Sequence, residues 1–553
     1  MANVNQTISA RPQSAPPVQA DKHASAALAE APAEPVHESP ARAAALHLED
    51  RREEALSVLN GAIDAGESEA ELFSARALLQ YELGQFAEAA SGYEQVLSLH
   101  PQHPTAPYNL AVCYERLGRW QDAAAAFSKA VQREPNRLDA RLGLGIALLH
   151  LEKAQPALEA FEKVLAEAPD QETAQFGKGV ALQLMAKLDE AAAIYARLFE
   201  KNPHSEECAT NMVVIAMARK DDALLREWSE RLLTIRPNSQ TALEGLAAHA
   251  FASGDYEAAA TYCSKLVESA PAQFERWFNL GVAYQRLQRF DQAAEAYQEA
   301  LRLRPDAKQA YVNLGVVFQE KGDLQAAREC YERALQIAPD LADVQFNLAS
   351  VFEKEGRKEE AERLYVKLLA RDPEWEDAWF RLGYLRLERQ AWREAVDGFE
   401  ACVRKRRDWP EAQLNLALAY WNSGDRDAAA RAFHTVLELQ ENSTDALRGL
   451  AALAIERQDY EQALDLQARL IEAGERSPEL FYNTGLLLQK SGQLDDAVRL
   501  YNEALAEKPD FPEALLNLGH ALKAQGHEDE ARKYWRQALE ARPQLAQGYF
   551  DKA

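Results

Sequence analysis

The sequence has few cysteines, glycines and prolines for its length. Its 553 residues include 5 cysteines, 25 glycines and 23 prolines. The cysteines lie far apart, form no CxxC pair and are odd in number, which argues against a disulfide framework and favours a reducing compartment. We therefore expect a cytoplasmic protein. The numbers of glycines and prolines are also low for a chain of several globular domains joined by turns and linkers.

The chain also lacks positive charge and long apolar runs. It has 62 Lys and Arg against 87 Asp and Glu, a formal net charge of −25, which repels phosphate backbones and anionic lipid surfaces. No basic segment followed by an apolar run opens the sequence, and no stretch approaches the roughly 18 apolar residues of a membrane span. We expect no nucleic-acid partner, no secretory signal and no membrane insertion.

What the sequence does contain is a repeat with a period of 34 residues. One column of this repeat is proline, at Pro101, Pro135, Pro169, Pro203, Pro237, Pro271, Pro305, Pro339 and Pro373, and again at Pro509 and Pro543. A second column, from Ala89 to Ala531, is alanine except at Leu225. A third column holds small residues such as Gly281 and Gly315. Nothing has been inserted or deleted between these columns.

Each period predicts a pair of helices. Between Trp277 and Pro305, apolar residues recur at helical spacing on both sides of a polar break. Glycine often stands at the break, where it ends a helix in the left-handed conformation at least cost. Such glycines are Gly84, Gly118, Gly254, Gly322, Gly356, Gly424, Gly492 and Gly526. The closing proline cannot continue the second helix, and the small-residue column marks where two helices touch.

These columns resemble the tetratricopeptide repeat, with its aromatic, Leu-Gly, Tyr, Ala, aromatic, Ala and Pro positions. The match is clearest from Trp277 to Pro305 and from Tyr311 to Pro339. The resemblance implies an all-α fold, a right-handed superhelix or α-solenoid of helix-turn-helix repeats. It also implies that the first helices line the concave wall. A long array of this kind is similar to the repeat arm of some sugar transferases.

The register predicts four segments. Residues 1–38 are rich in Ala, Pro and Ser and are expected to be a disordered tail. Residues 39–69 form a degenerate capping helix pair, residues 70–545 contain fourteen units of 34 residues, and residues 546–553 form a short C-terminal cap in which Tyr549 and Phe550 can begin a helix. The unit from Glu206 to Ser239 departs most from the pattern, and the bulk of Leu225 predicts a local irregularity there.

No constellation for catalysis, metal binding or a cofactor is present. The sequence has no phosphate loop, no nucleophile elbow and no HExxH. The carboxylates favour solubility and the helix dipole, and the cysteines fit helix packing. The basic run from Arg404 to Arg407 ends a second helix, where positive charge complements the dipole, so we interpret it as structural. We predict no enzyme activity, no metal site and no cofactor.

The variable face of the first helices carries a column of asparagines. A carboxamide can donate to a peptide carbonyl and accept from a peptide N–H, so it can bind backbone without reading sequence. The column is similar to the asparagine ladder of tetratricopeptide superhelices that hold extended peptides, while bridging of neighbouring helices explains the same residues. The candidate contacts are Asn109, Asn279, Asn313, Asn347, Asn415, Asn483 and Asn517. Asn211 shares the column, which Gly143, Gly177, Gly245, Arg381 and Gly449 interrupt.

A neighbouring apolar column adds further candidates, because exposed aromatic rings suit an apolar or amphipathic partner segment. These are Phe278, Phe346, Phe380 and Tyr482, with Arg381 as a single charge on the same face. We expect a non-catalytic scaffold that binds an extended or helical segment of a partner protein in the concave groove. Two alternatives stay open: a substrate-targeting subunit whose enzyme is another chain, and a scaffold that forms homo-oligomers through its terminal caps.

Overall fold

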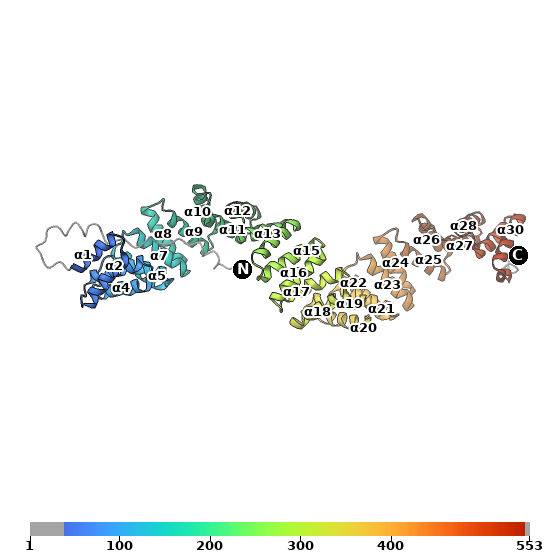
Figure 1. Cartoon of the computed structure of the whole chain (residues 1–553). Coiled ribbons are helices and arrows are strands. Elements are labelled where there is room, and N and C mark those ends of the chain that lie inside the picture. The colour runs from blue at the N-terminus through green and yellow to red at the C-terminus, as the bar shows by residue number, and fades with distance from the viewer. Residues whose placement is uncertain (1–37, 548–553) are drawn as a thin grey trace. The chain divides into compact units, whose positions relative to one another are not determined.

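The computed structural model describes residues 38–547, and every regular element in that range is a helix. The chain divides into two compact units, residues 1–304 and 305–553, and the boundary falls at the column proline Pro305. Within each unit the helices follow one another as pairs joined by short turns (Figure 1). The prediction of an all-α solenoid is therefore confirmed for each unit.

The first unit contains α1 (Glu38–Leu48), α2 (Arg52–Asp64), α3 (Ala70–Glu82), α4 (Phe86–Leu99), α5 (Ala106–Arg116), α6 (Trp120–Arg133), α7 (Leu138–His150), α8 (Ala154–Glu167), α9 (Glu172–Leu184), α10 (Leu188–Lys201), α11 (Glu206–Arg219), α12 (Asp222–Ile235), α13 (Gln240–Ser253), α14 (Tyr256–Ser269), α15 (Phe274–Arg286) and α16 (Phe290–Leu303). The second unit contains α17 (Lys308–Glu320), α18 (Leu324–Ile337), α19 (Ala342–Lys354), α20 (Lys358–Leu369), α21 (Glu376–Glu388), α22 (Trp392–Lys405), α23 (Pro410–Ser423), α24 (Arg426–Leu439), α25 (Thr444–Glu456), α26 (Tyr460–Glu472), α27 (Pro478–Lys490), α28 (Leu494–Glu507), α29 (Pro512–Ala524) and α30 (Glu528–Ala541), followed by a short 3₁₀ turn over Pro543–Leu545.

The turn inside each repeat always passes through one left-handed residue. All eight glycines predicted to end a first helix have positive φ, between 71° and 95°. The same column is left-handed in the six repeats that lack glycine, at Glu152, Ala186, Lys220, Gln288, Gln390 and Gln458. Packing of the two helices therefore imposes this conformation even on residues for which it costs about 1–2 kcal/mol.

The two helices of a repeat meet where an aromatic ring of the second helix lies on a glycine of the first. In α15 and α16, a Cβ added at Gly281 would stand 2.6 Å from the ring of Tyr297, closer than any real contact. Gly315 meets Tyr331 in the same way, also at 2.6 Å. This confirms that the small-residue column is a helix-helix contact, because a larger side chain would push the ring away.

Many of these rings also end in a recurrent hydrogen bond. The hydroxyl of Tyr297 donates to Gln285 Oε1 at 2.7 Å, and Tyr501 donates to Gln489 Oε1 at 2.7 Å. The same pairing joins Tyr195 to Gln183 and Tyr331 to Gln319. The carboxamide lies twelve residues before the tyrosine in each case, so a phenol that is otherwise buried keeps a partner.

Neighbouring repeats are joined at the column proline. Trp277 Nε1 donates to the Pro271 carbonyl at 2.8 Å, and Trp379 Nε1 donates to the Pro373 carbonyl at 2.8 Å. Gln345 replaces the indole and reaches the Pro339 carbonyl with its amide, at 2.6 Å. The proline therefore ends a second helix, and its carbonyl is bound by the first helix of the following repeat.

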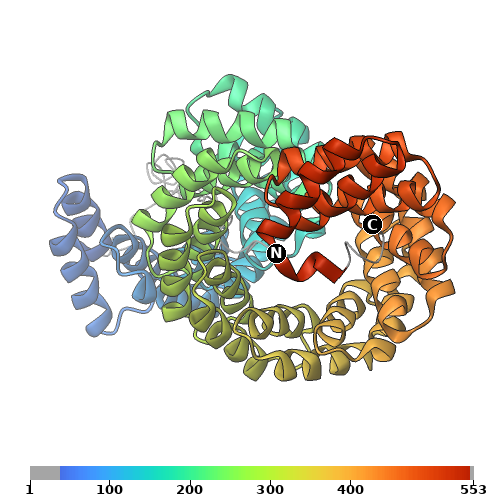
Figure 2. The same cartoon turned by 90° about the vertical axis from the view of Figure 1, so that its right-hand side faces the viewer.

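Buried residues form a series of clusters, each spanning a few consecutive repeats, without one central core. First helices of adjacent repeats touch, as α7 touches α9 and α21 touches α23, whereas no second helix makes a comparable contact with another second helix in the described part of the chain. The row of first helices is thus the more closely spaced row. In the second unit the pairs follow a curved path through yellow and orange to red (Figure 2). The more closely spaced row lies on the concave side of such a curve.

The repeat from Glu206 to Ser239 compensates for its unusual residues. Leu225 is buried, and Ser229, which stands in the aromatic column, is fully buried. A Cβ added at Gly245 would lie 2.3 Å from Ser229 Oγ, 3.1 Å from Leu225 and 3.2 Å from Val213, so two larger side chains fill the space that a ring occupies elsewhere. The predicted irregularity stays a prediction.

The terminal segments fall partly outside the described residues. The predicted tail over residues 1–38 lies there except for Glu38, which begins α1, and so do Tyr549 and Phe550 of the predicted C-terminal cap. The predicted capping pair corresponds to α1 and α2, whose contact buries Ala43 and Leu59. None of the helices over residues 38–547 combines the length and the apolar character that crossing a bilayer requires.

Candidate functional site

The concave face of the first helices carries the asparagine column, and three of its amides have no hydrogen-bond partner among residues 38–547. Asn279 in α15 and Asn483 in α27 are exposed, and Asn347 in α19 is half-buried. Each of these amides has donor and acceptor capacity left for a ligand. That these amides contact a peptide backbone stays a prediction.

Other members of the column are engaged within the protein. Asn109 is buried, and its Nδ2 donates to Tyr93 Oη at 3.3 Å. Asn517 is buried and donates to Tyr482 Oη at 3.1 Å and to the Glu513 carbonyl at 2.9 Å. Asn415 donates to the Glu411 carbonyl of its own helix at 2.8 Å, as Asn211 does to Glu207 at 3.0 Å. Asn313 is half-buried and also interacts within the chain.

The glycines that interrupt the column have a steric cause. A Cβ added at Gly143 would stand 2.5 Å from Phe127, one at Gly177 2.5 Å from Phe161, and one at Gly449 2.4 Å from Phe433. Each phenylalanine belongs to the second helix of the preceding repeat. Its ring tip occupies the space that Asn109 uses when a tyrosine precedes it. At these three junctions the ring leaves no room for an asparagine side chain, whereas Asn415 follows Phe399 and is accommodated by donating to the Glu411 carbonyl of its own helix.

The aromatic candidates lie between neighbouring helices. Phe346 stacks on Trp375 with ring centroids 5.2 Å apart and meets Tyr365 edge-on at 5.5 Å. Two others are placed in the same way, Phe380 between Phe399 and Trp409 and Tyr482 between Tyr501 and Phe511. Phe278 meets Tyr297 of α16 but stacks on Phe274 of its own helix. All four are half-buried, so helix packing uses most of each ring and leaves an edge accessible.

Arg381 replaces asparagine in the column and carries the column's one charge. Its guanidinium lies 3.5 Å from the carboxylate of Glu353, whose side chain is largely buried. Burial raises the pKa of the Glu353 carboxyl, and the neighbouring Tyr365 and Arg381 act in the opposite direction. Arg381 is half exposed, so it neutralises a buried acid and still presents part of its guanidinium on the concave face.

The sequence predictions missed a second apolar column on this face. It lies three residues after the asparagine column, and residues three apart share one face of a helix. Val282, Val316, Leu418 and Leu486 are half-buried there, and Tyr384 is 41% exposed. The overlooked signal in the sequence is the position of these apolar residues, three residues after the asparagine column.

Over residues 38–547, no group of three or more His, Cys, Asp or Glu side chains is placed to hold a metal ion. The five cysteines are all buried and free. Burial raises the pKa of Cys113, Cys263, Cys330 and Cys402 to about 12, so their thiols are protonated near neutral pH.

Comparison with known proteins found solved structures with low similarity to this chain. No curated protein sequence matches the chain. Crystal structures of similar fold include YrrB, described as a TPR protein with an unusual peptide-binding site (20% identity, 34% of this chain and 96% of that chain covered, TM-score 0.31). The MamA protein has 23% identity over 32% of this chain and 96% of that chain, with a TM-score of 0.29. Cut9–Hcn1, an APC/C hetero-tetramer, has 15% identity over 82% of this chain and 97% of that chain, with a TM-score of 0.29.

Models of the tetratricopeptide repeat match along most of the sequence. One matches residues 74–137, 116–172, 142–206, 221–274, 278–342 and 414–478, and a second matches residues 318–383 and 488–549. The first alone spans more than half of the chain. The repeat period, the left-handed turn column and these matches agree, and the chain belongs to the tetratricopeptide repeat family.

Proposed function

We propose that this chain is a non-catalytic scaffold that binds an extended segment of a partner protein along the concave face of its first helices. The observation that carries the proposal is that first helices of each unit bear unpartnered amides set beside apolar side chains, Asn279 in the first unit and Asn347 and Asn483 in the second. Residues 38–547 offer these amides no intramolecular hydrogen-bond partner.

The spacing of the first helices suits an extended chain. Helices in contact have axes about 8–10 Å apart. An extended strand rises about 3.3 Å per residue, so each repeat spans about three residues of a bound segment. A backbone carbonyl or N–H can therefore meet the protein at each repeat whose first helix carries an unpartnered amide.

The energies indicate that the asparagines act together with the apolar column. Each hydrogen bond contributes about 0.5–1.5 kcal/mol net, so three contribute about 1.5–4.5 kcal/mol. Micromolar affinity corresponds to about 8 kcal/mol. The difference equals about two apolar side chains buried by the ligand, at about 1.5–3 kcal/mol each. Tyr384 and Leu418 supply such contacts on α21 and α23.

The test compares two sets of three substitutions. In the first, N279A, N347A and N483A are combined; in the control, the exposed residues Asn136, Asn238 and Asn502, in loops and on a second helix, are changed to alanine. Partners crosslinked to the wild-type chain in extract of its source cells are identified by mass spectrometry, and the contacting segment is then synthesised and titrated by fluorescence anisotropy.

We expect the first set to weaken binding of that segment at least tenfold, because three hydrogen bonds are lost, while the control set binds like wild type. Both proteins should unfold at the wild-type temperature. Tyr384→Ser should weaken the same binding through lost apolar contact. Equal affinity of the first set and the wild type would refute a role for the asparagine column.

A further inference from the structure

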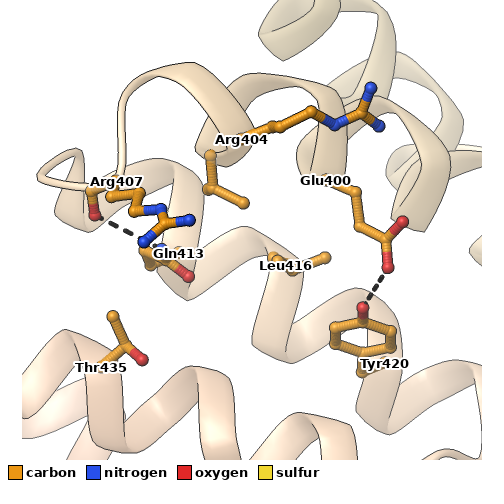
Figure 3. A pocket seen from close by; sticks show the side chains of 8 residues that line it. Glu400, Arg404, Arg407, Gln413, Leu416, Tyr420 and Thr435 are labelled. Atoms are coloured by element: carbon orange, nitrogen blue, oxygen red, sulfur yellow. Dashed lines mark hydrogen bonds between the residues drawn. The ribbon is translucent and has the colours of Figure 1, made fainter.

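A pocket lies between consecutive repeats of the second unit, on the side of α23 that faces away from the asparagine column. Its volume is about 410 Å³, within the range of about 300–1000 Å³ found for ligand pockets. Its lining residues are Glu400, Val403, Arg404, Arg407, Gln413, Leu416, Tyr420 and Thr435 (Figure 3). Gln413 and Asn415 are two residues apart on one helix and so point about 200° apart. The pocket and the concave face are therefore separate surfaces.

Two departures from the repeat pattern coincide at this pocket. Arg407 stands in the proline column, and Gln413 stands where α21 has Trp379. Gln413 Nε2 still donates to the carbonyl of residue 407, at 3.4 Å, as Trp379 does to Pro373 at 2.8 Å. The backbone connection is thus kept while a large indole is replaced by a small amide. The space left by the indole is open, and a guanidinium stands at its edge.

The four cations from Arg404 to Arg407 are not equivalent. Lys405 pairs with Glu374 at 2.6 Å, and Arg406 lies over the ring of Trp409, 4.6 Å from its centroid. Arg404 and Arg407 line the pocket, are exposed, and have no carboxylate within 4.0 Å among the described residues. In a chain with 25 more acidic than basic side chains, two unpaired guanidiniums in one pocket are available for an acidic ligand.

The pocket's own carboxylate is turned away from these arginines. Glu400 lies four residues before Arg404, a spacing at which glutamate and arginine pair on a helix. Its Oε1 instead accepts the hydroxyl of Tyr420, on the opposite wall of the pocket (Figure 3). Tyr420 thus fixes the carboxylate of Glu400, while the guanidinium of Arg407 stands at the other end of the pocket beside Gln413 and that of Arg404 extends above the lining on the side of Glu400 (Figure 3). Leu416 and Val403 form an apolar part of the lining between them.

We propose that this pocket binds an acidic segment of a partner protein, with one glutamate or aspartate side chain on Arg404, a second on Arg407, and an apolar side chain between them on Leu416 and Val403. A guanidinium binds a carboxylate through two parallel hydrogen bonds, so each of the two arginines selects an acid over an amide. The site is a second docking surface, which does not depend on occupation of the concave face.

The experiment uses the full chain and a fluorescein-labelled peptide of alternating glutamate and leucine, measured by fluorescence anisotropy. Matched peptides carry glutamine or lysine in place of glutamate. We expect the glutamate peptide alone to bind, and its affinity to fall as salt rises. R404Q with R407Q should weaken it at least about tenfold, while R363Q, an exposed arginine on α20, has no effect.

A second pair of variants separates the cavity from the charge. Gln413→Trp keeps both arginines and fills the pocket with the side chain used at Trp379, so binding should be lost while the melting temperature is kept. Gln345→Trp makes the same change at the equivalent position of α19 and should bind normally. The proposal is overturned if Gln413→Trp binds like wild type, if the glutamine peptide binds equally well, or if inorganic phosphate displaces the peptide stoichiometrically, which would indicate a small-anion site. The concave-face variant N279A/N347A/N483A should bind this peptide normally.

Discussion

Replacing Ala186 with glycine should stabilise the protein. Ala186 ends the turn between α9 and α10 with φ 58°, in the left-handed region. That conformation costs an L-residue about 1–2 kcal/mol, and glycine avoids the cost. Glycine also gives the unfolded chain more freedom, which offsets about 0.4–1 kcal/mol. We expect a net stabilisation of about 0.5–1 kcal/mol.

The reverse change is available in the same column. Gly322 has φ 81°, and a Cβ added there would meet no atom within 4 Å. Gly322→Ala therefore adds no clash and should destabilise by about 0.5–1 kcal/mol through the backbone alone. Ala125 is exposed within α6 and gives the matched control. Ala125→Gly is the same chemical change as Ala186→Gly, yet it should destabilise by about 1 kcal/mol, because its residue is in an α-helix.

Hydrogen exchange measured by mass spectrometry is the suitable assay, because repeat arrays open locally rather than as a whole. In Ala186→Gly the peptides of α9 and α10 should exchange about two- to fivefold more slowly, the factor that corresponds to 0.5–1 kcal/mol. The peptides around α17 and α18 should exchange faster in Gly322→Ala by a similar factor. Faster exchange in Ala186→Gly would refute the assignment of strain to the left-handed turn.

Three further changes test the packing. Tyr501→Phe removes the 2.7 Å hydrogen bond to Gln489 and should destabilise by about 1 kcal/mol, with a double-mutant cycle against Gln489→Leu giving the coupling energy. Arg276→Met should destabilise by about 1–3 kcal/mol in urea titration, since the buried guanidinium donates to the Leu266 carbonyl at 3.0 Å and to three side chains. The raised thiol pKa values predict slow reaction of the native chain with a thiol reagent at pH 8 and fast reaction in urea. The folded state binds the thiol protons more tightly than the unfolded state does. The contribution of these thiols to the free energy of unfolding should therefore be fully present below the ordinary thiol pKa of about 8.5 and be lost as pH rises toward about 12.

The helices were predicted well from the sequence because the same pattern recurs in every copy of the repeat. The glycine breaks and the proline column gave the ends of first and second helices, and the structure confirms them at Gly84 and Gly526 alike. Left-handed turns at Ala186 and Gln288 were not predictable from local preference, since neither residue favours that conformation. Contact between the two helices of the repeat sets the turn, and that contact is not a local property of the sequence.

The candidate site was predicted less completely, because each side chain's role depends on a neighbour in another repeat. Asn109 and Asn347 occupy the same column, yet only Asn109 is buried against a tyrosine. From its column, Phe380 is predicted to be an exposed aromatic ring of the groove. In the structure, the ring of Trp409, 29 residues later, stacks on it. Arg407 was interpreted with the rest of its basic run, although the run divides between ion pairing, an aromatic contact and an open pocket.

The steric pairing across each junction has a consequence for how such chains can be rearranged. Phe433 and Gly449 fit one another, as Tyr93 and Asn109 do, and in both cases the two residues belong to successive repeats. A cassette cut at the column prolines would separate these partners, so that Phe433 would no longer face Gly449 and Tyr93 would no longer face Asn109. A cassette cut at the left-handed turns keeps a second helix with the first helix that follows it. The transferable module of this protein is therefore the junction between repeats, and recombination or design should exchange that segment.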